Sequence, residues 1–267
     1  MTSRHAFSPV LREQARRERE LQELVFGEEK LLESVFPRHV IVEMTQRVMT
    51  LEPARLDKHM ATSHEQVTIL FADLVGFTTM SEQLPPKEVM MLLNRLFTAF
   101  DDLLDEYGVY KVETIGDCYV VAGGLMIKDR DNFQVVRGAS CGVCPANATS
   151  TMRFAKAMLM EAAHVQHPGA STPVCMRIGM HTGPVMSGVV GSKMPRFCLF
   201  GDTINTASRM ESTSLPGCIH VSAVTHSLLP LEGPWRASGG VQVKGKGLME
   251  TYFWAPPDPP LATEIHE

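Results

Sequence analysis

The most informative stretch of this chain reads Val67-Thr-Ile-Leu-Phe-Ala-Asp73-Leu-Val-Gly-Phe-Thr78. Its apolar run over 67–72 predicts a buried strand that ends at Asp73. The glycine-containing backbone that follows can turn tightly and offer N–H groups to phosphate oxygens. We therefore regard Phe77 and Thr78 as candidate substrate-binding residues.

A second carboxylate lies in a predicted hairpin. Residues 111–122 form two β-rich runs separated by Gly116-Asp117, which is typical of a tight turn. Either aspartate alone is ordinary, because turns favour Asp for local hydrogen bonds. If the fold brings Asp73 and Asp117 together, they repel each other unless cations lie between them. Oxygen ligands of this kind suit Mg²⁺ or Mn²⁺.

The remaining pattern predicts an α+β fold. Apolar side chains at alternating spacings of three and four predict a helix over 87–107, and Gly108 ends it. Helices and strands alternate without regular βα repeats, which disfavours a doubly wound sheet. Further elements are expected as helices at about 152–165 and 203–211, a strand at 174–180, and alternating strands within 241–254.

Polar and cationic residues in the last third of the chain are candidates for contacts with a nucleotide. Asn205 and Arg209 are four positions apart on a predicted helix, so they share one face. A solvated surface is the ordinary interpretation, but the planar fork of arginine also suits phosphate. Lys244 and Lys246 lie in a glycine-spaced segment from which they can reach a triphosphate, although this short pattern is weak evidence by itself.

Composition indicates one globular domain with a short extension. The chain has 267 residues, of which 44% are hydrophobic and 21% charged, enough for a core without disulfides. The formal charge of -5 argues against a nucleic-acid binder. No apolar run has membrane-spanning length, and residues 1–25 lack a signal-peptide core. We therefore predict a cytoplasmic catalytic domain that does not insert into membrane, within a parent protein that is either soluble or membrane-attached.

The cysteines predict reduced thiols in the cytosol. They fall into no obvious framework, and the chain is not small. A Cys-x-x-Cys pair could be a redox pair or half of a zinc site, but no second pair has matching spacing. The six are Cys118, Cys141, Cys144, Cys175, Cys198 and Cys218.

Three segments flank or interrupt the predicted domain over 61–255. Residues 1–60 are expected to be a helical linker segment, in which 11–50 are charged and helical in pattern, with apolar positions near a heptad repeat over about two heptads. This segment is either a surface helix or a parallel helix that joins two subunits, and Pro37 interrupts it. Residues 127–151 resemble an inserted, mobile loop, and 256–267 form a proline-rich tail.

Five segments together resemble the motifs of class III adenylate and guanylate cyclase domains, in the same order. The resemblance spans about 64–254 and implies a ferredoxin-like βαββαβ core. It also implies a head-to-tail dimer with active sites in the interface. The segments are Val67–Thr78, Lys111–Asp117, Arg177–Val185, Phe197–Ser212 and Val243–Gly247; the third resembles a strand and turn of the family.

The resemblance assigns roles to the candidate residues. Asp73, Asp117 and the backbone of Leu74 would hold two Mg²⁺ or Mn²⁺ ions in one subunit. The partner subunit would supply Asn205 to orient the ribose and Arg209 to stabilise charge on the α-phosphate.

Lysines would hold the remaining phosphates. Lys244 would bind the terminal phosphates with Lys246 as a helper. Lys193 falls where some relatives place a further phosphate-binding cation, from the metal-bearing subunit.

Guanine is the base expected in this site. Glu113 stands at the family's base-reading position and can accept from guanine N1–H and N2–H, while the Cys198 thiol can donate weakly to O6. Adenylate-specific relatives tend to have Lys and Asp at these positions. Arg196 either braces Glu113 or lies on the surface. We therefore predict a guanylate cyclase that makes cyclic GMP from GTP.

Two alternatives remain, an adenylate cyclase with relaxed base choice and a catalytically silent module that dimerises. A homodimer is favoured because one chain carries both the metal pair and the base-reading pair. Glu29-Lys-Leu-Leu-Glu-Ser-Val-Phe-Pro37 is similar to the helix that links many guanylate cyclase domains to a sensor, so an upstream sensor domain is expected.

Overall fold

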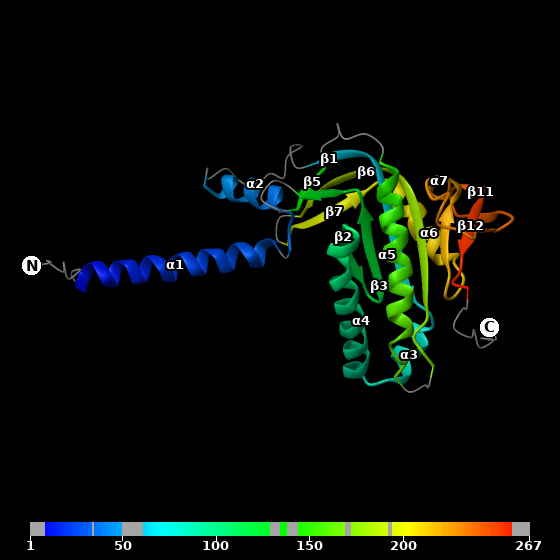
Figure 1. Ribbon diagram of the computed structural model, residues 1–267, viewed down its shortest axis with the longest axis horizontal. Helices are drawn as coiled ribbons and strands as arrows, with labels where there is room; N and C mark the ends of the chain where they lie inside the picture. The colour runs from blue at the N-terminus through cyan, green and yellow to red at the C-terminus, as the bar shows by residue number, and fades with distance from the viewer. Residues whose placement is uncertain are drawn as a thin grey trace, which may run out of the picture.

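Helices and strands alternate along the chain, and most strands gather into one large sheet (Figure 1). The computed structural model describes residues 9–33, 35–49, 61–128, 134–137, 144–168, 172–191 and 194–257. The helices are α1 (Pro9–Glu33), α2 (Arg38–Met49), α3 (Phe77–Gln83), α4 (Pro86–Tyr107), α5 (Pro145–Ala163), α6 (Asp202–Ser212) and α7 (Ala223–Ser227). The strands are β1 (Thr62–Leu74), β2 (Val109–Ile115), β3 (Cys118–Gly123), β4 (Met126–Lys128), β5 (Gln134–Val136), β6 (Met176–Val190), β7 (Arg196–Phe200), β8 (Ile219–Ser222), β9 (Arg236–Ala237), β10 (Val241–Val243), β11 (Gly247–Met249) and β12 (Thr251–Trp254).

The strand order confirms the predicted α+β fold. Among the described residues, the main sheet runs β2-β3-β1-β6-β8-β12-β9, and β7 pairs with β6. β1 lies between β3 and β6 and is antiparallel to both, and β3 is antiparallel to β2. The sequence of β1, α4, β2, β3, α5 and β6 is therefore a ferredoxin-like βαββαβ unit.

β1 is mainly apolar and buried over Val67–Ala72 because helices cover both faces of the sheet there. Leu70 and Ala72 join the cluster beneath α4 and α5, which lie side by side; we name this side the α4/α5 face (Figure 1). Ile69 and Phe71 point the other way, into a cluster that includes Ala207 of α6; we name this side the α6 face. By the same alternation, Asp73 at the end of β1 belongs to the α6 face.

The predicted hairpin and long helix are confirmed. Ile115 pairs with Cys118 across the turn at Gly116-Asp117. α4 buries four apolar side chains and ends at Gly108, whose φ of 63° favours glycine. The buried side chains are Val89, Leu92, Leu96 and Phe100.

Two boundaries differ from the prediction. Residues 145–151 are helical and not part of a loop, because Pro145 suits a first helical turn and Ala148 packs into the core. The segment also contains the short β4–β5 hairpin. β6 does not turn near Pro184 but continues to Val190, since pairing with β1 and then β7 sustains it.

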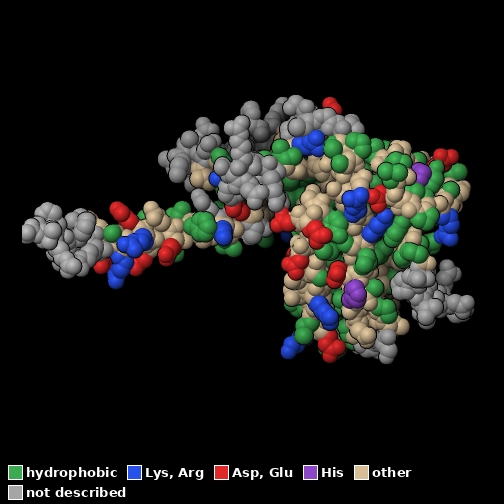
Figure 2. Space-filling view, in the orientation of Figure 1, with side chains coloured by type: hydrophobic (Ala, Val, Ile, Leu, Met, Phe, Trp, Pro, Cys, Tyr) green, Lys and Arg blue, Asp and Glu red, His purple; other side chains and the backbone are tan. Residues whose placement is uncertain are grey.

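The N-terminal segment divides into two helices at Pro37, as the sequence predicts. α2 packs on the α6 face of the domain through Val40, which is buried. α1 extends away from the rest, with exposed apolar side chains such as Leu24 and Leu31 among its charged ones (Figures 1 and 2). No helix in the described ranges is both long and apolar enough to cross a membrane.

α6 lies directly on β6 because two glycines leave room for it. A Cβ added at Gly179 would lie 1.8 Å from the backbone nitrogen of Glu211. One added at Gly183 would lie 2.7 Å from Oγ1 of Thr203. The glycines of this strand therefore fix the position of a helix that carries candidate site residues.

We predict that Gly179→Ala displaces α6 and lowers the free energy of unfolding by about 3 kcal/mol, because the clash is with backbone. Urea unfolding measures the effect. Gly27→Ala is the control, since a Cβ there meets nothing within 4 Å and Ala is favoured over Gly inside a helix, so that it should not lower stability. Equal stability of Gly179→Ala and the wild type would contradict the direct contact.

Candidate active site

The structure brings Asp73 and Asp117 together. Asp73 is at the end of β1 and Asp117 in the β2–β3 turn, both half-buried. Burial raises the pKa of Asp117 to about 6, with further contributions from the charge of Asp73 and a hydrogen bond to its carboxyl group. Backbone hydrogen bonds from Leu74 and Asp117 itself oppose the rise. The predicted carboxylate pair therefore exists, and the charge of Asp73 disfavours the ionisation of Asp117.

An arginine that sequence analysis did not single out joins this pair. Arg177, opposite Asp73 in the β1–β6 register, places Nη2 3.1 Å from Oδ2 of Asp73. Its Nε lies 3.5 Å from Oε1 of Glu211, at the end of α6. β1, β6 and α6 therefore each contribute one member of an Asp73–Arg177–Glu211 network.

The network has more acidic than basic groups. Burial, and next to it the charge of Asp73, raises the pKa of Glu211 to about 7. The charge of Arg177 lowers this pKa, and the charge of Asp117 raises it slightly further. Two carboxylates thus share the Arg177 guanidinium and a third, Asp117, lies beside Asp73, which leaves an excess of acidic groups among these described residues.

This donor set fits a divalent cation. Mg²⁺ commonly binds through one or two carboxylates and completes its shell with water and substrate phosphates. The described residues hold no group of three or more His, Cys, Asp or Glu side chains arranged around a metal. The pair Asp73 and Asp117 therefore suits an ion that a substrate helps to hold.

A β-bulge in β2 determines the face of the sheet on which Glu113 lies. Lys111 pairs with Val121 on the α4/α5 face, whereas Glu113 pairs with Val120 on the α6 face. Residues two apart on a regular strand point to the same face, so the shift at Val112 is what turns Glu113 over. Alternation alone could not have predicted this orientation.

The structure brings Glu113 close enough to Cys198 for the charge of the carboxylate to act on the thiol. Glu113 is exposed on β2, and Cys198 is half-buried on β7. Burial raises the pKa of the Cys198 thiol, and the charge of Glu113 raises it further while Arg196 lowers it. The thiol is therefore protonated at neutral pH and able to donate a hydrogen bond.

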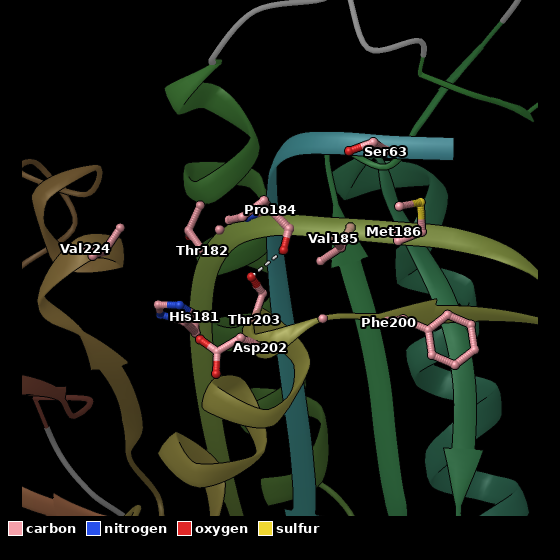
Figure 3. A pocket seen from close by; sticks show the side chains of 12 residues that line it. Ser63, His181, Thr182, Pro184, Val185, Met186, Phe200, Asp202, Thr203 and Val224 are labelled. Atoms are coloured by element: carbon pink, nitrogen blue, oxygen red, sulfur yellow. Dashed lines mark hydrogen bonds between the residues drawn. The ribbon is translucent and has the colours of Figure 1, made fainter. Parts of the chain in front are cut away.

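Asn205 and Arg209 are both exposed on α6. The opposite side of this helix is buried through Thr203, Ala207 and Met210. Thr203 donates a hydrogen bond of 2.6 Å to the carbonyl of Pro184 and so ties the helix start to β6 (Figure 3). The two candidate residues therefore face outward from the chain.

The predicted lysines lie in different settings. Lys244 is exposed in the turn between β10 and β11, and Lys246 forms an ion pair with Asp202 at the start of α6. Lys193 lies outside the described residues.

The loop after β1 enters α3. Gly76 adopts a φ of 75° just before this helix. Thr78 is exposed, whereas Phe77 packs partly against the core. Any phosphate contact from Phe77 would therefore involve its backbone.

A pocket of about 570 Å³ lies beside the start of α6 (Figure 3). His181 borders it and hydrogen-bonds Ser222 over 2.7 Å. Burial lowers the pKa of His181 to about 4, helped by the charge of Lys246. The metal pair and the base-reading pair do not line this pocket.

The described cysteines are all free, as predicted. They are half-buried at positions 118, 144, 175, 198 and 218. Cys141 lies outside the described residues, so the predicted absence of a zinc or redox role for its pair with Cys144 stays a prediction.

Comparison with known proteins assigns this site to a family. Residues 59–255 match the model of the adenylate and guanylate cyclase catalytic domain. The chain belongs to this family. The match covers the whole ferredoxin-like unit together with Asp73, Asp117 and the α6 segment.

Curated relatives of this cyclase domain are much longer proteins. The chain is 41% identical over 84% of its length to guanylate cyclase soluble subunit beta-2 of Rattus norvegicus. It is 45% identical over 72% of its length to the receptor-type guanylate cyclase gcy-28 of Caenorhabditis elegans. It spans 30% and 14% of these relatives, respectively.

Solved cyclase domains have the same fold. The guanylate cyclase domain of RhGC from Catenaria anguillulae, in complex with GTP, is 36% identical with a TM-score of 0.62. That match covers 72% of this chain and 97% of the other. The adenylyl cyclase CyaB from P. aeruginosa is 25% identical with a TM-score of 0.63, covering 75% and 98%.

We predict that Asp117→Asn stabilises the metal-free domain at pH 8. The pKa of Asp117 is higher in the folded protein than the ordinary 3.8, so its ionisation costs stability as pH rises from about 4 through 6. The substitution removes this cost and should raise Tm by about 2–4 °C.

Thermal unfolding in chelator at pH 8 and pH 4.5 checks this prediction. The gain should shrink at the lower pH, where Asp117 is protonated in the folded state but still mostly ionised in the unfolded state, whose pKa is the ordinary 3.8. A lower Tm for the variant at pH 8 would show that the pair does not repel.

Proposed function

We propose that this domain converts GTP into 3′,5′-cyclic GMP and pyrophosphate. The observation that carries the proposal is that Glu113 lies close enough to Cys198 for its charge to raise the pKa of the thiol. The names of the relatives, which are guanylate cyclases, support the same substrate. So does the GTP complex of the RhGC domain.

Base choice follows from hydrogen bonding. The Glu113 carboxylate accepts from guanine N1–H and N2–H, and the Cys198 thiol donates to O6. Adenine offers an acceptor at N1 and a donor at N6, so both contacts would be mismatched. Unpaired polar groups of this kind reject a substrate strongly.

Asp73, Asp117 and the backbone of Leu74 would hold two Mg²⁺ or Mn²⁺ ions. When bound, such ions neutralise phosphate charge and lower the pKa of the ribose 3′-hydroxyl. The 3′ oxygen attacks the α-phosphorus in line and pyrophosphate leaves. The protein mainly positions the substrate and stabilises the developing charge.

Other residues complete the substrate site. Asn205 orients the ribose and Arg209 stabilises charge on the α-phosphate. Lys244 binds the terminal phosphates, and Lys246 assists once it leaves Asp202. Backbone N–H groups at Phe77 and Thr78, with Lys193, contribute further phosphate contacts in the metal-bearing subunit.

Two copies of the chain form two shared sites. Arg209 is exposed while Glu211, two residues later, is buried against Arg177; two helical positions differ by about 200°. Arg209 therefore points away from the metal pair of its own chain. A symmetric dimer would supply it to the partner's metal pair.

Purified domain with Mn²⁺ is predicted to cyclise GTP at least about a hundredfold faster than ATP, because Glu113 and Cys198 are matched to guanine. Glu113→Lys combined with Cys198→Asp should reverse the preference. Glu106→Lys, the control, makes the same Glu-to-Lys change at an exposed position of α4 and should leave the preference for GTP unaltered. Equal rates for both nucleotides in the wild type would refute the base assignment.

A mixed dimer tests the shared sites. Asp73→Asn and Asn205→Ala homodimers should both be inactive, whereas a mixture should regain up to one working site per dimer. Cyclic GMP production after subunit exchange, with exchange verified by mass, measures this. Inactive mixed dimers that have demonstrably formed would mean that each site belongs to one chain.

A further inference from the structure

We propose that Glu211 is a positioning residue that holds Arg177 and thereby keeps Asp73 available to bind metal. This inference rests on the proposed function, because it assigns a role within the same site. It follows from the arrangement of three side chains on three elements.

Glu211 is poorly explained as a source of stability. Its side chain is only 11% exposed, and Oε1 has no hydrogen-bond partner among the described residues. The 3.5 Å separation from Nε of Arg177 suits an ion pair but is longer than an ordinary hydrogen bond. A buried carboxylate so incompletely paired costs free energy.

The position of Glu211 is nevertheless tightly fixed. Its backbone nitrogen lies against Gly179 of β6, where no Cβ could be accommodated. Arg177 is two residues earlier on the same strand and opposite Asp73 on β1. Backbone packing therefore sets the distance from Glu211 to the guanidinium.

The guanidinium is shared between two carboxylates. Nη2 holds Asp73 while Nε faces Glu211. Without the negative charge of Glu211, Arg177 would pair with Asp73 alone. A fully paired Asp73 would be a weaker metal ligand, because the guanidinium competes with the cation for the same oxygen.

The first test measures Mn²⁺ binding to the purified domain by electron paramagnetic resonance at pH 8, without nucleotide. Glu211→Gln should weaken binding about tenfold, the usual size for a group that orients a metal ligand. Glu211→Asp should recover part of the loss. Glu106→Gln, which neutralises an exposed carboxylate on α4, should bind as the wild type does.

A double-mutant cycle separates positioning from a simple loss of charge. In an Arg177→Gln background, Glu211→Gln should weaken Mn²⁺ binding no further, because its effect passes through Arg177. An equal loss in both backgrounds would overturn the proposal. Unchanged binding in Glu211→Gln, or no binding to the wild type, would overturn it as well.

A second test asks which site Glu211 serves. A mixed dimer of Asn205→Ala and Asp73→Asn chains has one working site, whose metal pair comes from the Asn205→Ala chain. Glu211→Gln in that chain should lower activity and raise the Mn²⁺ concentration for half-activation, whereas in the other chain it should change neither.

If Glu211 only supports α6, the loss would instead follow the chain that supplies Arg209, and the proposal would fail. The two proposals also fail separately. Mn²⁺ binding tests Glu211 without any turnover, whereas absence of GTP cyclisation with normal Mn²⁺ binding would count against the proposed function alone. Tm and dimer mass show whether each variant folds.

Discussion

Asp73 and Asp117 place two carboxylates beside each other in a half-buried position, which is unfavourable unless positive charge lies nearby. The surrounding structure is arranged around this constraint. The end of β1 and the β2–β3 turn bring the two groups together, and β6 supplies Arg177 from the adjacent strand. One guanidinium does not balance the pair, because Glu211 also draws on it. The remaining negative charge is what a divalent cation would neutralise.

α6 has a buried side that reaches this acidic centre and an exposed side that points away from it. Its buried side rests on Gly179 and presents Glu211 to Arg177, while its exposed side presents Asn205 and Arg209. In the proposed dimer, the same short helix thus supports the metal pair of its own chain and supplies catalytic groups to the partner. The close backbone packing of α6 on β6 fixes the positions of both sets of side chains relative to each other.

Much of the frame was predictable because it depends on local pattern. The apolar run before Asp73, the turn at Asp117 and the spacing of α4 each predicted an element that the structure contains. The family motifs indicated which residues in these elements are candidate site residues. Lys193 lies outside the described residues, and the substrate roles of all the candidates stay predictions.

Other features depend on contacts between distant segments. The bulge at Val112, which turns Glu113 over, is visible only from the pairing of β2 with β3. The pairing of Arg177 with Glu211 requires α6 to lie on β6, and nothing in the Arg177–Val185 motif by itself indicates that Gly179 makes room for this helix. Likewise, β6 continues past Pro184 because neighbouring strands sustain it, although the sequence suggested a turn.

In the proposed mechanism, Asp73 and Asp117 form the metal site used for GTP cyclisation. The most direct measurement counts Mn²⁺ ions bound to the domain in complex with 3′-deoxy-GTP, which lacks the attacking hydroxyl. We expect two ions per chain in the wild type and a loss of bound metal in Asp73→Asn. A full complement of Mn²⁺ in folded Asp73→Asn protein would contradict this mechanism.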